Sequence, residues 1–208
     1  MFSIIEAAGW PIWPLILCSV IALAIIGERM WSLRQSLVMP RNLLTQTVQE
    51  YRQNGVSAEM LNRLGAHSPL GQVFAAALRN IQSTPTVIKE SIEEASRAVE
   101  IELERFLTTL GTIAAIGPLL GLFGTVIGMI EIFGAQSPTG TNPQQLAHGI
   151  SIALYNTAFG IAIAIPALIF YRHYRNKVDT YVVEMEQQAS KLVDIVHGER
   201  VDFAGERR

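Results

Sequence analysis

The chain has 208 residues, half of them hydrophobic, and a formal net charge of −2. A charge so close to zero provides no basic surface for nucleic acid, so we expect no nucleic-acid partner. The single cysteine, Cys18, excludes an internal disulfide and a cysteine-based metal cage. The sequence has no evident nucleophile–base pair or phosphate-binding loop, so we expect neither an enzyme nor a cofactor or metal site.

Three stretches without charged side chains are long enough to cross a bilayer. They extend from Ala7 to Gly27, from Phe106 to Ile130, and from near Leu146 to Tyr171. A helix of about 20 apolar residues crosses the hydrocarbon core of a bilayer. No water is available there to bond the main chain, so a spanning segment forms a helix, which pairs its own N–H and C=O groups. The sequence therefore predicts an all-α integral membrane protein with three transmembrane helices. Because no Lys or Arg precedes Arg29, the first stretch is interpreted as a retained anchor.

The positive charges predict how the spans are oriented. Of the sixteen Lys and Arg residues, eight lie in 34–105 and seven follow Tyr171, whereas 134–145 has none. Basic loops stay in the cytoplasm. The prediction is an outward N-terminus with the first anchor (1–33), a cytoplasmic helical loop (34–105), a transmembrane hairpin (106–171) and a cytoplasmic C-terminal helix (172–208). A short interfacial helix before Gly9 and a tight turn within 134–145 are also expected.

The loop 34–105 is patterned as helices that lead into the second span. Three stretches are predicted to be helical: Pro40–Asn54, Ser57–Leu64 and Ser68–Ile81. Thr84 and Pro85 then have the residue types of an N-cap and a first helical position. Because neither Gly nor Pro occurs between Thr86 and Gly111, we predict one helix that runs unbroken from Thr86 to Phe133.

Long helical extensions of the second and third spans are each predicted to carry an apolar stripe. The first stripe is Ile88, Ile92, Ala95, Val99 and Phe106; the second is Val178, Val182, Met185, Ala189, Leu192 and Val196. An amphipathic helix is stable only if its apolar face is covered. The stripes must therefore pack on each other, on the helices of 40–81 or on a neighbouring subunit, and their spacing does not decide between these partners.

Small residues follow one face of both later spans. The predicted helix-packing residues are Gly117, Gly121, Gly124, Gly128, Gly149 and Gly160, together with Pro118 and Pro166. Small residues allow helix backbones to approach closely in lipid. The pattern fits a tight helical hairpin, with or without a further role in a larger assembly.

Polar groups on these faces are few, and none at mid-depth is charged. Thr125 and Thr157 are predicted to occupy one layer near the middle of the membrane, with Asn156 next to Thr157. An ion path built from this chain alone would offer these hydroxyls but no titrating group at its centre. The alternative is that each hydroxyl only bonds the carbonyl four residues before it. Glu131 and His148 lie near the outer ends of their spans, where they either meet at a pore mouth or are separately solvated.

The stretches Gly117–Glu131 and Gly149–Pro166 resemble the second-span and third-span motifs of the MotA/TolQ/ExbB proton-channel family. Three spans with a large first cytoplasmic loop look like the ExbB and TolQ branches of this family. Of the two branches, the sequence looks more like ExbB. The resemblance implies a subunit of a proton-driven motor in the bacterial inner membrane. It also implies a homo-oligomeric ring, a pentamer, around a single-span ExbD/TolR-like partner that supplies a membrane Asp. Thr125 and Thr157 match the family's pore-facing threonines, so the resemblance implies that they line the proton pathway, and Asn156 is counted with them. One departure is Ile152, which stands where some members carry a Glu.

The expected function is therefore coupling of the proton gradient to a TonB-like transducer for outer-membrane transport. Two alternatives remain open. One is a TolQ-like subunit of the Tol–Pal envelope system. The other is a membrane scaffold that conducts nothing, in which the small faces matter and the hydroxyls do not.

Overall fold

The structure is a computed structural model that describes residues 8–134 and 143–198. The interfacial helix expected before Gly9 and the tight turn expected within 134–145 lie almost entirely outside these residues. The chain divides into two compact units. The apolar unit is Met1–Arg29 with Phe106–Tyr174, and the polar unit is Met30–Arg105 with Arg175–Arg208.

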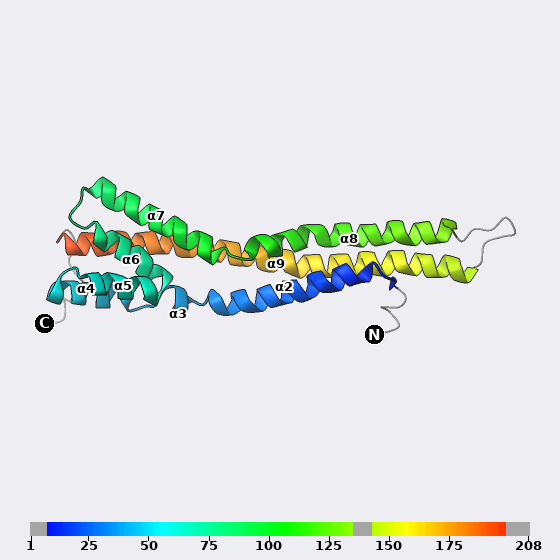
Figure 1. Ribbon diagram of the computed structural model, residues 1–208, viewed down its shortest axis with the longest axis horizontal. Helices are drawn as coiled ribbons and strands as arrows, with labels where there is room; N and C mark the ends of the chain where they lie inside the picture. Colours follow the sequence, from blue (N-terminus) through cyan, green and yellow to red (C-terminus); the bar gives the residue numbers. More distant parts are fainter. Residues whose placement is uncertain (1–7, 135–142, 199–208) are drawn as a thin grey trace. The chain divides into compact units, whose positions relative to one another are not determined.

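All regular secondary structure in the described residues is helical (Figure 1). The helices are α2 (Ile12–Ser32), α3 (Gln35–Val38), α4 (Leu43–Asn54), α5 (Ala58–His67), α6 (Pro69–Arg79), α7 (Pro85–Leu103), α8 (Leu107–Gly134) and α9 (Pro143–Val196). Within residues 8–134 and 143–198, three helices are long and apolar enough to cross a membrane, namely α2, α8 and α9 from Leu146 onward. The predicted fold class is thus confirmed: the chain is an all-α membrane protein with three candidate spans.

In the apolar unit, α2, α8 and the first part of α9 lie side by side (Figure 1). The helix α2 is attached to α9 by the Tyr174 hydroxyl, which donates a hydrogen bond of 2.9 Å to the carbonyl oxygen of Ile26. Tyr174 is buried, and its ring stacks beside Phe170. Because a buried phenol needs a partner for its O–H group, this bond satisfies the hydroxyl and fixes one point of contact between α2 and α9.

The predicted unbroken helix from Thr86 to Phe133 is wrong. The helix α7 ends at Leu103 and α8 begins at Leu107, because Phe106 has a φ of +65°. A left-handed conformation at a non-glycine residue costs about 1–2 kcal/mol and needs support from its surroundings. That support includes the Arg29 guanidinium, which lies 5.6 Å from the centre of the Phe106 ring. The apolar spacing runs through the break without interruption, so periodicity could not locate it.

In the polar unit, the short helices begin at side-chain caps. The Ser57 hydroxyl accepts a hydrogen bond from the Met60 amide at the start of α5, and the Ser68 hydroxyl accepts one from the Gly71 amide at the start of α6. These bonds satisfy amides that have no partner within the first turn of a helix. The three predicted loop helices exist with slightly shifted ends, since the first begins at Leu43 rather than Pro40. The short helix α3 was not predicted.

The two apolar stripes differ in detail from the prediction. In α7, Ser96 is buried and Ala95 is only half-buried, and Phe106 is exposed. In α9, Tyr181 occupies a buried position and Val182 is half-buried. The Tyr181 hydroxyl donates a hydrogen bond of 3.1 Å to the carbonyl of Leu33, directly after α2 ends. A tyrosine can therefore replace an apolar residue at the buried position because its polar end reaches an otherwise unpaired carbonyl.

Candidate functional site

The small residues bring α8 and α9 into backbone contact. They are Gly117, Gly121, Gly124 and Gly128 of α8, with Gly149 and Gly160 of α9. A Cβ atom on Gly128 would lie 2.5 Å from the carbonyl oxygen of Gly149, and one on Gly160 would lie 2.5 Å from the carbonyl oxygen of Gly117. Side-chain carbons do not approach other atoms so closely, so only glycine fits at this contact. Pro118 and Pro166 lie inside the same helices, but their rings are on exposed faces.

Asn156 is completely buried in this contact. Its Nδ2 atom donates hydrogen bonds to the carbonyl oxygens of Ala8, at 2.7 Å, and Ile152, at 2.8 Å. A Cβ atom on Gly124 would overlap the Asn156 side chain, so the glycine leaves the room that the amide occupies. The Oδ1 atom is buried without a hydrogen-bond partner among the described residues. Asn156 is therefore held by its two donor hydrogens, one of which reaches the segment before α2.

Thr157 follows Asn156 and faces α8. Its hydroxyl lies 3.1 Å from the carbonyl oxygen of Ala153, in its own helix, and 3.4 Å from that of Gly121, across the contact. The Thr125 hydroxyl donates to the Leu122 carbonyl of its own helix at 2.6 Å. Both threonines are half-buried, and no hydrogen bond joins their hydroxyls in the described part of the chain. A hydroxyl that donates to a carbonyl keeps its lone pairs, so each threonine can still accept a hydrogen bond from a proton donor.

No charged group lies near these hydroxyls along the helices. The sequence has no Asp, Glu, Lys or Arg between Leu107 and Ile130 in α8, or between Gly149 and Tyr171 in α9. Glu131 and His148 are both exposed, and no ion pair joins them in residues 8–134 and 143–198. Hydroxyl and amide groups can orient a proton through hydrogen bonds, but they do not hold it as a titrating group. Ile152, where some relatives are expected to carry a Glu, is buried.

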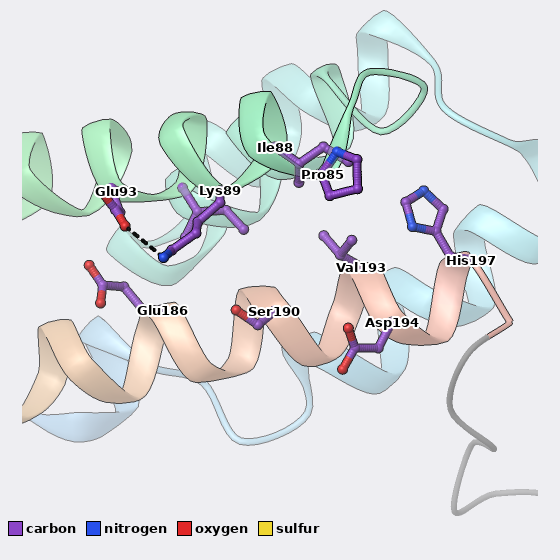
Figure 2. A pocket seen from close by; sticks show the side chains of 10 residues that line it. Pro85, Ile88, Lys89, Glu93, Glu186, Ser190, Val193, Asp194 and His197 are labelled. Carbon is purple, nitrogen blue, oxygen red and sulfur yellow. Dashed lines mark ion pairs between the residues drawn. The ribbon is translucent and has the colours of Figure 1, made fainter.

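The polar unit contains a groove of about 290 Å³ between α7 and the last turns of α9 (Figure 2). Its walls combine the apolar side chains of Ile88 and Val193 with Glu186 and with Lys89, which pairs with Glu93 at 3.7 Å (Figure 2). This mixture is typical of the surface between packed amphipathic helices, and we assign it no function.

Three carboxylates gather in the polar unit, those of Glu100, Glu104 and Asp179, with oxygen atoms within 4.8 Å of one another. Arg175 lies 3.6 Å from Glu104 and offsets part of the negative charge. The group is partly exposed. Exposed carboxylates beside an arginine form a surface ion-pair network, which is a weak indication of a metal site.

Several contacts of the apolar unit were not predicted from sequence. They are the bonds from Asn156 to Ala8 and from Tyr174 to Ile26, and the contact between Arg29 and Phe106. The costly burial of an amide indicated that Asn156 needed a partner. No sequence signal names that partner, because it is a main-chain carbonyl 148 residues away.

Comparison with known proteins places these features in one family. The model of the MotA/TolQ/ExbB proton channel family matches residues 65–187. The chain is 33% identical to the biopolymer transport protein ExbB-like 3 of Synechocystis. The match extends over 182 residues, which are 86% of this chain and 87% of that protein. It is 31% identical to the biopolymer transport protein exbB1 of Vibrio cholerae, over 78% of this chain and 74% of that protein. The Tol-Pal system protein TolQ of Haemophilus influenzae is 29% identical, over 86% of this chain and 82% of that protein. The chain therefore belongs to the MotA/TolQ/ExbB proton channel family and is ExbB-like within it.

Proposed function

We propose that this chain is an inner-membrane subunit that couples the proton gradient to a TonB-type energy transducer for outer-membrane transport. The observation that carries the proposal is the pair of half-buried hydroxyls, Thr125 and Thr157, on two glycine-packed helices without a charged residue at mid-depth. It is supported by the ExbB-like relatives of the chain. The protein acts as a channel and motor subunit, and no catalytic role or bound cofactor is proposed for it.

The missing titrating group identifies the kind of partner. A proton that crosses an uncharged interior needs a group that can bind it. A carboxylate at mid-depth is costly in lipid, so such a carboxylate is found only where protein lines the path. In our proposal, copies of this chain form a ring, a pentamer, around a single-span ExbD/TolR-like partner that carries a membrane Asp. Thr125 and Thr157 line the path beside that Asp, and Asn156, which is completely buried, supports the same layer from behind the path. Glu131 and His148 lie at the mouth of the pore.

The topology of the proposal follows the charges. The N-terminus with the first anchor (1–33) begins in the periplasm, and the hairpin 106–171 lines the pore. The loop 34–105 and the C-terminal helix 172–208 lie in the cytoplasm, because together they carry fifteen Lys and Arg residues and basic segments remain on that side of the membrane. One elementary charge that crosses a potential of 100 mV releases about 2.3 kcal/mol, which is the energy available to move the ring relative to its partner.

The first test replaces the hydroxyls without changing side-chain shape. Thr157→Val and Thr125→Val remove a hydroxyl and keep the branched side chain, and Thr157→Ser keeps the hydroxyl as a matched control. In cells that contain the single-span partner, we expect both Val variants to lose energised outer-membrane uptake and the Ser variant to retain it. Full uptake with Thr157→Val, in a complex that assembles normally, would contradict the proposed proton pathway and favour a scaffold.

The second candidate function is a TolQ-like role in the Tol–Pal envelope system. It is favoured by one observation, the 29% identity to the Haemophilus influenzae TolQ protein over 86% of this chain. The two candidates share the proton pathway and differ in the partner. Purification of the native complex and identification of its single-span subunit separates them, because an ExbD-like subunit supports the first function and a TolR-like subunit supports the second.

A further inference from the structure

The buried amide of Asn156 joins three parts of the apolar unit at one point. It belongs to α9, it fills the space beside Gly124 of α8, and it donates to the carbonyl oxygen of Ala8, just before α2. The exposed fraction of Asn156 is zero. A polar group in an apolar interior is favourable only when it is hydrogen-bonded, so the position of this amide is set by the carbonyls that it reaches.

The donors of this amide are fully used and its acceptor is not. Nδ2 carries two hydrogens, and the carbonyl oxygens of Ala8 and Ile152 accept both. Oδ1 is buried without a partner among the described residues. A hydrophobic side chain at position 156 would avoid the cost of burying an unpaired oxygen. What Asn provides in its place is the bond to Ala8, because the bond to Ile152 lies within its own helix.

The two residues at this point each precede a threonine of the proposed proton pathway. Asn156 precedes Thr157, and Gly124 precedes Thr125. Adjacent residues of a helix keep a fixed rotation and rise, so the fit of the amide beside Gly124 also sets where both hydroxyls lie. The Thr157 hydroxyl lies 3.4 Å from the Gly121 carbonyl, one turn away on the same contact.

The segment before α2 has a second contact with α8 at the same level. The Trp10 ring packs edge-on against Phe123, with ring centres 6.0 Å apart, and Phe123 precedes Gly124. Gly9, between Ala8 and Trp10, has a φ of +69°, a turn that directs the chain into α2. The segment 8–10 therefore touches both helices that carry the hydroxyls.

We propose that Asn156 is a positioning residue, which fastens the segment before the first span to α8 and α9 and so holds Thr125 and Thr157 in register. This inference rests on the proposed function, because the hydroxyls matter only if protons pass them. It assigns the first span a second role, since its start fixes the geometry of the pathway helices.

The test measures proton flux in vesicles that contain the full chain with its single-span partner. Asn156→Leu has similar volume and no donor. Asn156→Ser can still bond the Ile152 carbonyl, but it is one bond too short to reach Ala8. Tyr174→Phe is the matched control, because it removes another side-chain bond between α9 and α2 that lies 17 residues beyond Thr157. A second readout is the fluorescence of Trp10, recorded with Trp13 and Trp31 replaced by Phe.

We expect both Asn156 variants to reduce proton flux about tenfold, since small misplacements of reacting groups cost up to about a hundredfold in rate. Trp10 emission should shift in both variants, and Tyr174→Phe should change neither readout. Wild-type flux in Asn156→Ser would overturn the proposal. Reduced flux with unchanged Trp10 emission would also overturn it, because the amide would then act on the proton directly. If Asn156→Leu does not assemble, Asn156→Ser decides the question.

Failure of this inference can be distinguished from failure of the proposed function. Thr157→Val, measured in the same vesicles, should abolish flux without changing Trp10 emission. If Thr157→Val abolishes flux and Asn156→Ser does not, the proton pathway stands and the positioning role of Asn156 falls. If Thr157→Val conducts normally, the proposed function fails, and the positioning role that rests on it fails as well.

Discussion

Gly128 shows how closely the contact between α8 and α9 is packed. A methyl group there would lie 2.5 Å from the Gly149 carbonyl oxygen, whereas one on Gly27, inside α2, would meet no atom within 4 Å. We expect Gly128→Ala to lower the free energy of unfolding by about 1–3 kcal/mol, because overpacking forces backbone shifts. Gly27→Ala should be neutral or stabilise by up to about 1 kcal/mol, because Ala is the better helix former.

Thermal unfolding of the two variants in the same detergent measures this difference. Equal shifts for Gly128→Ala and Gly27→Ala would show that the α8–α9 contact is looser than described.

At the same scale, the sequence predicted the glycine faces and not the partners of the polar side chains. The spacings between Gly117, Gly121, Gly124 and Gly128 are four, three and four residues, which places these glycines on one face of a helix. Asn156 and Tyr174 instead donate to main-chain carbonyls. Every residue has such a carbonyl, so no residue type marks the acceptor, and only the fold brings donor and acceptor together.

The break between α7 and α8 is the feature of the helices that is most open to a mutational test. Phe106 has a φ of +65°, which glycine adopts without strain. Phe106→Ala and Phe106→Gly both remove the ring that lies over Arg29. We expect the Gly variant to be more stable than the Ala variant by about 1 kcal/mol, because Gly removes the strain and Ala keeps it.

In a continuous helix the order of these two variants would be reversed, since Gly is then the less stable by about 1 kcal/mol. The melting temperatures of the two variants therefore report whether the break exists in solution. A more stable Ala variant would restore the unbroken helix that the sequence predicts.

The starts of α5 and α6 were predictable because they depend on local chemistry, since the hydroxyls of Ser57 and Ser68 accept amide hydrogens of the first turn. The break was not predictable, because Phe106 is neither Gly nor Pro and the buried positions Leu103 and Leu107 keep helical spacing across it. The position of Tyr181 was missed for a similar reason. A period of 3.6 residues favours either Tyr181 or the adjacent Val182, and only the bond to the Leu33 carbonyl distinguishes them.

For the whole molecule, the central feature is a pair of membrane spans without a charged residue in their interior. The spans α8 and α9 contribute hydroxyls, an amide and glycines between Leu107 and Ile130 and between Gly149 and Tyr171, and no charged residue. A continuous proton pathway needs a group that alternates between bound and free proton. The chain belongs to a family of proton channels, and in our proposal it conducts only together with a second protein that supplies such a group.

The most direct test of that account is proton flux into vesicles that contain the purified chain, measured under a pH gradient with and without its single-span partner. The account predicts flux only when the partner is present, and loss of that flux when the membrane Asp of the partner is replaced by Asn. Equal flux from this chain alone would contradict it, because the hydroxyls of Thr125 and Thr157 would then suffice.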